Sequence, residues 1–231
     1  MAKSSYKIHV YLEIGKKRTF AGVLDWPGWC RGGSDQESAL QALIDYAPRY
    51  ANVLSSARLG FRAPTEPSVF KVVERLKGDM TTDFGSPGIP PAYDASPVDD
   101  AELRRLQSLL KACWRMFDAA AKTASGKTLR LGARGGGRDL EKIVRHVQEA
   151  EHMYVTRLGW QHRLGTAADW SRQPNQARQE TLLALEASAH GELPTRGPRG
   201  GIRWKARYFV RRAAWHVLDH AWEIEDRTGD A

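Results

Sequence analysis

The chain contains little of what several common protein classes require. It has only two cysteines, Cys30 and Cys113, in 231 residues, and they do not form a C-x-x-C pair. This excludes a disulfide framework and a zinc site built from paired thiolates. No apolar run approaches the roughly 18 residues of a membrane helix, and the first residues lack the apolar centre of a signal peptide. We therefore expect a cytoplasmic protein without a membrane segment.

Motifs of two large enzyme classes are also missing. The sequence has no G-x-S-x-G, and the glycines at 135–137 do not belong to a P-loop pattern. These absences argue against a serine hydrolase and a P-loop nucleotidase. The 42% hydrophobic and 27% charged residues are typical of an ordinary globular protein, whose length admits one large domain or two small ones.

Residues 1–85 are predicted to form a small α+β domain. Polar and apolar side chains partly alternate in 6–14 and 19–24, which predicts a β-hairpin. Residues 34–54 have helical periodicity, and 68–76 predict a third strand. The expected order is β-β-α-β, with Cys30 and the glycines that follow it in a turn.

The start and the middle of the predicted helix carry distinct signals. Ser34 precedes Glu37 by three residues, which is the capping-box spacing and predicts that Ser34 caps the helix. Pro48 lies within the apolar line, so we expect a kink or break near Ala47. Segments 25–30 and 34–40 resemble the strand-turn-helix entry of HicB-like antitoxin domains, which implies a small ferredoxin-like sheet but no function.

Residues 86–97 carry four prolines and predict an extended linker. Beyond it, residues 98–231 are predicted to form a four-helix bundle. Cys113 falls on the apolar line of the first of these helices, where a small core residue is expected. The connection 161–174 exceeds the usual length between antiparallel neighbours and could cross the bundle. The predicted helices span about 99–123, 139–160, 175–190 and 204–227.

Three histidines give the strongest chemical signal. His216 and His220 are four residues apart, so both imidazoles lie one turn apart on one face of the last helix. His146 lies at the edge of the apolar stripe of the second helix. Three imidazoles that leave coordination positions open suit a catalytic metal better than a closed structural site. The alternative is that each histidine is an ordinary core or surface residue with hydrogen-bond partners.

A di-iron carboxylate site is the nearest competing interpretation. Glu149 and His152 form an E-x-x-H pair, but such a site needs a second E-x-x-H pair and two further glutamates. His152 lies about 120° around the helix from His146, so the two rings cannot easily face one site. Glu149 and Glu223 each lie within one turn of a histidine, and they are either exposed acids or partners of the site.

Segments 143–151 and 211–227 resemble the DinB/YfiT superfamily of metal-binding four-helix bundles. The resemblance implies that one histidine of the second helix and an H-x-x-x-H pair of the fourth bind a divalent ion. These positions correspond to His146, His216 and His220. It implies zinc, nickel, iron or manganese without choosing among them, and it places a crossover between the second and third helices.

The resemblance also implies an enzymatic role, because members of this superfamily include thiol-dependent S-transferases and isomerases. The expected cosubstrate is a low-molecular-weight thiol or another anionic small molecule. Arg211 and Arg212 are then predicted to bind an anionic group of the substrate. The alternative is a non-enzymatic, metal-stabilised binding protein whose basic patch contacts an acidic partner or nucleic acid. A homodimer, the reaction and the role of the first domain are left open.

Positive charge is concentrated in the second half. Residues 98–231 hold 23 Lys and Arg against 17 Asp and Glu, whereas residues 1–97 hold 12 against 10. The stretch 193–218 contains no acid, which opposes the dipole of the helix that begins there unless an anion is bound. Aromatics interleave with cations in 203–209, but core packing explains them equally, and the absence of a recognised motif disfavours nucleic acid. Further cations flank the glycines before the second helix: Arg130, Arg134 and Arg138.

Overall fold

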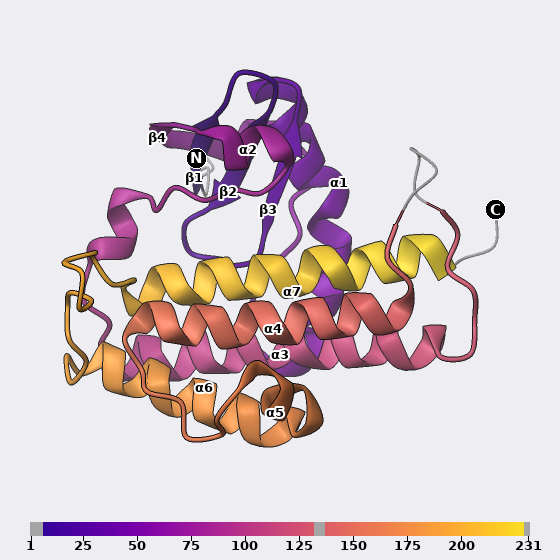
Figure 1. Ribbon diagram of the computed structural model, residues 1–231. Helices are drawn as coiled ribbons and strands as arrows, with labels where there is room; N and C mark the ends of the chain where they lie inside the picture. The colour runs from indigo at the N-terminus through magenta and orange to yellow at the C-terminus, as the bar shows by residue number, and fades with distance from the viewer. Residues whose placement is uncertain (1–6, 132–136, 229–231) are drawn as a thin grey trace. The chain divides into compact units, whose positions relative to one another are not determined.

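The computed structural model describes residues 7–131 and 137–228 (Figure 1). The chain divides into two compact units whose boundary lies between Ser96 and Pro97. The first unit holds a four-stranded mixed sheet, and the second consists mainly of helices. This confirms the expected α+β class. Among the described residues, no helix is long and apolar enough to cross a membrane.

The sheet of the first unit has the strand order β3-β2-β1-β4. Its strands are β1 (Ile8–Ile14), β2 (Thr19–Val23), β3 (Cys30–Gly33) and β4 (Phe70–Lys77). β1 pairs antiparallel with β2 and parallel with β4, and β2 pairs antiparallel with β3. The predicted order β-β-α-β is therefore incomplete, because the strand β3 precedes the helix.

The strand β3 occupies residues that we expected to form a turn. Gly33 pairs with Thr19 of β2, so the glycine-rich sequence extends the sheet. A Cβ atom at Gly33 would lie 2.5 Å from the backbone nitrogen of Ala39. Glycine is required here because the strand passes very close to the first turn of the next helix, and this need for space, rather than a turn, explains its presence.

The helix α1 (Gln36–Leu54) begins one residue later than the capping prediction. Asp35, in an extended conformation, is the N-cap, and its carboxylate accepts a hydrogen bond from the Ser38 backbone at 2.8 Å. The Ser38 hydroxyl accepts in return from the backbone N–H of Asp35 at 3.1 Å, so the prediction of Ser34 was wrong. Of the kink or break expected near Ala47, the break was wrong, since the helix continues through Pro48 with buried residues on both sides.

Aromatic side chains hold α1 against the sheet. Trp29 is fully buried, and its indole N–H donates to the carbonyl of Leu43 at 2.9 Å. Its ring stacks on that of Tyr50 with the centroids 5.7 Å apart. The Tyr50 hydroxyl donates to the carbonyl of Pro27 at 2.7 Å. Each buried polar atom on these rings thus has a partner, as a buried aromatic core requires.

The proline-rich segment after β4 folds onto the sheet of the same unit. The carboxylate of Glu13, which is fully buried, accepts hydrogen bonds from the Thr82 hydroxyl at 2.6 Å and from the backbone N–H groups of Gly88 and Ile89 at 3.0 Å. The first unit therefore includes these residues. The short helices of this unit are η1 (Ser55–Ala57), η2 (Pro67–Val69), α2 (Met80–Phe84) and η3 (Ala92–Ala95).

The second unit contains four long helices at the predicted places, each within two residues of its expected bounds. α7 contacts α3, α4 and α6, and the ribbons of α3, α4 and α7 run side by side (Figure 1). A short helix that we did not predict lies in the long connection before α6. The helices are α3 (Asp100–Ala124), α4 (Leu140–Leu158), α5 (Ala167–Arg172), α6 (Pro174–Ala189) and α7 (Ala206–Thr228).

Both cysteines are buried. Cys113 lies in the core on α3, which confirms the expectation, and burial raises the pKa of its thiol. Cys30, expected in a turn, is the first residue of β3 and is 2% exposed. Neither thiol is placed for reaction with solutes, because the reactive form is an accessible thiolate.

Candidate metal centre

Two neighbouring helices present the three predicted histidines. Asp139 caps α4 by accepting from the backbone of Lys142, and Ile143 and Val147 of its apolar stripe are buried. α7 contacts α4 and is buried along most of its length. His146 projects from α4, and His216 and His220 project from α7. The helical periodicity that buries the stripes therefore also brings the imidazoles together.

The three rings surround a common point. One ligand atom from each of His146, His216 and His220 lies within 4.8 Å of the others. The Nε2 atoms of His146 and His216 are 3.2 Å apart, close to the separation of about 3.3 Å between nitrogens that share a tetrahedral ion. The ring centroids are 4.7–5.0 Å apart. The three ligand atoms are therefore close enough for one divalent ion to contact them all.

Burial favours the neutral form of two of the imidazoles, those of His216 and His146. His216 is 7% exposed, and loss of solvent, followed by the nearby charges of His220 and Arg212, lowers its pKa well below the ordinary value. Burial also lowers the pKa of His146, with a further contribution from Arg138. A neutral imidazole has a free nitrogen lone pair, which is the form that binds a metal.

Hydrogen bonding does not satisfy these nitrogens fully. In the described part of the chain, Nδ1 of His216 is buried without a hydrogen-bond partner. Its Nε2 faces only the Nε2 of His146. Two neutral imidazoles can share one proton between these Nε2 atoms, or both Nε2 lone pairs can face one cation while each proton stays on Nδ1. A cation between the Nε2 atoms would satisfy both of these lone pairs, so the donor set fits a metal.

Glu223 orients His220. Its Oε2 lies 2.7 Å from Nδ1 of His220, and its Oε1 accepts a hydrogen bond from Arg227 at 2.7 Å. The hydrogen bond from His220, and then the charges of His220 and Arg227, lower the pKa of Glu223. An ionised acceptor on Nδ1 holds the proton there and leaves Nε2 of His220 as the ligand atom.

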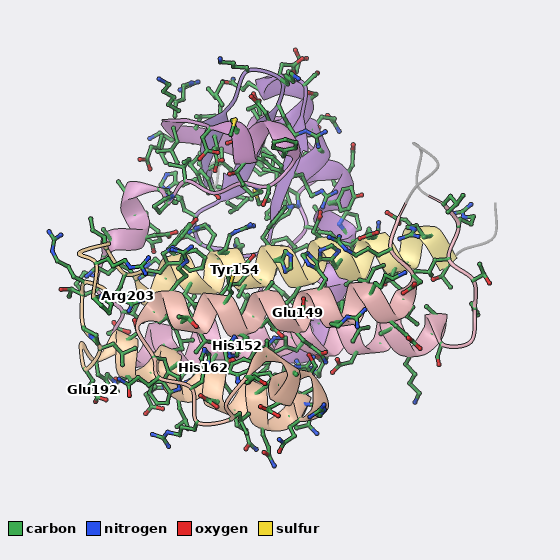
Figure 2. All side chains as sticks on the ribbon, in the orientation of Figure 1. Glu149, His152, Tyr154, His162, Glu192 and Arg203 are labelled. Carbon is green, nitrogen blue, oxygen red and sulfur yellow. The ribbon has the colours of Figure 1, made fainter. Side chains whose placement is uncertain are left out.

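Glu149 takes a different position. It is exposed on α4 (Figure 2), and its negative charge partly opposes the lowering of the His146 pKa, without a hydrogen bond between the two in the described structure. Of the two acids that the sequence left open, only Glu223 contacts a histidine of the cluster. This contact crosses less than one helical turn, so the spacing of three residues was the available signal.

Tyr154 and Arg212 lie beside the histidines. The Tyr154 ring meets that of His216 edge to face at 5.7 Å. The guanidinium of Arg212 lies 4.6 Å from the ring of Trp215 and 5.5 Å from that of Tyr154. Arg212 therefore places a positive charge next to the cluster. Arg211 is buried one position away on α7 at 4% exposure.

The basic stretch is not one uniform surface. Arg207 is 6% exposed and donates to Glu102 at 2.6 Å and to the carbonyl of Pro97 at 3.1 Å. Arg203 donates to the carbonyl of Thr156 at 2.8 Å. Several of the predicted patch cations thus hold the protein's own backbone and acids. Arg134 lies outside the described residues, whereas Arg196, Arg199 and Lys205 are exposed.

The E-x-x-H pair does not join the cluster. His152 stacks on His162 at a centroid distance of 3.8 Å, and both rings meet Trp170 of α5 edge to face. Figure 2 shows His152 and His162 next to each other, on the side of α4 away from Tyr154. The Glu149–His152 pair therefore supplies no second metal ligand set, and the di-iron interpretation lacks its geometry.

Comparisons of the chain with protein-family models, with curated proteins and with solved structures found no match.

Proposed function

We propose that the second unit binds one divalent metal ion through His146, His216 and His220. The observation that carries this proposal is the convergence of three ligand atoms within 4.8 Å from two helices. Neutral imidazoles suit zinc, iron and nickel, and manganese is also compatible with a mixed nitrogen and oxygen set. Three protein ligands leave coordination positions for a substrate or solvent, as in catalytic sites.

The resemblance of segments 143–151 and 211–227 to DinB-like bundles supports a thiol-dependent S-transferase or isomerase. When bound, the ion supplies Lewis-acid chemistry that lowers the pKa of a coordinated thiol. Glu223 holds the proton on Nδ1 of His220, at 2.7 Å, so that Nε2 remains free. Arg212, beside Tyr154, provides a positive charge for an anionic group of the thiol or its electrophile.

Elemental analysis of tag-free protein tests the metal proposal. The parent chain should contain about one equivalent of a divalent metal, and a His216→Ala, His220→Ala variant should lose it. His190→Ala is the matched control, because His190 pairs with Asp100 at 3.1 Å and lies outside the cluster. Metal retained by the double variant, or lost from the control, would place the site elsewhere.

A thiol-transfer assay after chelation tests the enzymatic role. Chelator-treated protein that remains folded, has no thiol-transfer activity and regains it with metal supports the enzyme. An Arg212→Gln variant should then raise KM for an anionic thiol more than for a neutral one, because it removes a charge and leaves the histidines in place. Equal effects on KM for both thiols would show that Arg212 does not bind the anionic group.

The alternative function is a metal-stabilised binding protein. The observation that favours it is the exposure of Arg196, Arg199 and Lys205 around a turn in which Arg196 bridges to Ile202. Binding of a nucleic acid by these cations should weaken steeply as salt is added, whereas thiol transfer should depend on metal. A chelated protein that unfolds and never shows turnover would favour this alternative over the enzyme.

A further inference from the structure

A second candidate site lies in the first unit. A pocket of about 500 Å³ is formed there by the start of β1, the turn after β2 and the loop 58–66. This volume falls within the range of about 300–1,000 Å³ for small-molecule sites. Its lining includes Ile8, Trp26, Arg62, Ala63, Pro64 and Val69.

Aromatic packing holds the walls of this pocket in place. Phe61, in the loop 58–66, meets the rings of Trp26, Trp29 and Tyr50 edge to face at 5.0–5.1 Å. Because Trp29 and Tyr50 are fully buried, Phe61 is anchored to the core of the unit. The loop therefore carries its next residue, Arg62, in a defined place, and the pocket is preformed rather than created by a ligand.

The lining combines an apolar wall with one cation. Trp26, Val69 and Pro64 offer apolar surface, and Arg62 is the charged residue among the described lining residues. Lys7 adds a second positive charge near this edge, where its ammonium donates to the carbonyl of Ser68 at 2.8 Å. Apolar surface favours a hydrophobic or aromatic body, and the guanidinium of Arg62 favours an anionic group on it.

We propose that this pocket binds a small aromatic carboxylate, with the ring against Trp26 and the carboxylate at Arg62. The site is built only from residues of the first unit, so it is independent of the three histidines. It gives the first unit a ligand-binding role of its own. A guanidinium binds a carboxylate through two parallel hydrogen bonds, which defines both the charge and the orientation of the ligand.

The test is a titration of the full chain with 2-naphthoate, followed by the indole N–H signals in proton–nitrogen NMR spectra. The Trp26 signal is identified by its absence in Trp26→Phe. The titration uses the His216→Ala, His220→Ala background, so that a carboxylate cannot bind at a metal. We expect the Trp26 signal to shift with a Kd of about 1 mM or tighter, as a ligand of this size can achieve.

Charge-matched ligands and variants decide the outcome. Arg62→Gln should weaken 2-naphthoate binding roughly fivefold and leave the neutral 2-naphthalenemethanol unchanged. Arg58→Gln, in the same loop but outside the lining, should change neither. The proposal is overturned if the Trp26 signal does not move at millimolar ligand. Equal affinity for the acid and the alcohol, or equal effects of Arg58→Gln and Arg62→Gln, also overturns it.

Discussion

Oε2 of Glu223 lies 2.7 Å from Nδ1 of His220, and Oε1 of the same carboxylate accepts from Arg227. Arg227 is in turn fixed by its Nε, which donates to the carbonyl of Arg130 at 2.7 Å. The imidazole orientation therefore depends on a chain of contacts at the end of α7. Carboxylates in this position hold the ring and increase the basicity of the opposite nitrogen.

Glu223→Gln should weaken metal binding by about tenfold, because an amide holds the His220 ring without the negative charge. Competition with a chromophoric chelator measures the change. Glu149→Gln is the control and should alter affinity less than about threefold, since the exposed Glu149 acts on His146 only through its charge. A larger effect from Glu149 than from Glu223 would reverse their assigned roles.

In the metal-free protein, the contribution of His216 to stability should decrease as the pH falls below 6.5. Burial lowers the pKa of His216, so the folded chain resists a proton that the unfolded chain binds below its ordinary pKa of 6.5. The contribution of such a group to stability is fully present above that pH. It falls by up to about 1.4 kcal/mol for each pH unit below it. The free energy of unfolding, measured with urea from pH 7.5 to 5, should depend less steeply on pH in His216→Leu than in the parent chain. An unchanged pH dependence would contradict this account.

Glu151 should give stability the opposite pH dependence, with the free energy of unfolding higher at low pH. It is buried, accepts a hydrogen bond from the Trp114 indole, and has its pKa raised from 4.5 to about 7 by burial. The folded chain keeps this proton between about pH 4.5 and 7 while the unfolded chain releases it. The free energy of unfolding should therefore fall by on the order of 3 kcal/mol as the pH rises across that window.

Glu151→Gln removes the titration and keeps an acceptor for Trp114. The difference in unfolding free energy between parent and variant, both metal-free, should change between pH 4.5 and 7 and level off above. Glu186→Gln, at an exposed position of α6, is the matched control and should give a constant difference. A flat difference for Glu151→Gln would mean that this carboxyl titrates normally.

Asp35→Ala should destabilise the first unit more than Ser34→Ala. Asp35 accepts from the backbone of Ser38 and closes a reciprocal cap, whereas the Ser34 hydroxyl contacts only the side chains of Asp35 and Ser38 in the described structure. Loss of an N-cap should lower the thermal midpoint by about 5 °C, measured by circular dichroism. Equal effects of the two substitutions on the thermal midpoint would contradict the assignment of Asp35, rather than Ser34, as the N-cap.

Features set by local periodicity could be predicted from the sequence. The spacing of four residues between His216 and His220 places both rings on one side of any helix, and α4 and α7 have apolar stripes that define their facing sides. The proximity of His146 followed from its place at the edge of such a stripe. The α+β class followed in the same way from the two hydrophobic periods.

Features set by tertiary contacts could not be predicted. β3 has four residues, two of them glycines, so its alternating pattern is too short to distinguish a strand from a turn. Glu151 looks like a solvent-facing acid because its partner, Trp114, comes from another helix. The shift of the cap from Ser34 to Asp35 is a local failure, since both residue types cap helices and only the backbone conformation distinguishes them.

The carboxylate of Glu13 determines where this chain can be cut. A fragment ending at residue 85 would keep Glu13 and the Thr82 hydroxyl but discard the N–H groups of Gly88 and Ile89. A buried carboxyl group would then lack two of its hydrogen-bond donors, which is costly. A fragment that contains the sheet on its own should therefore extend to Ser96, so that Gly88 and Ile89 remain to hold Glu13.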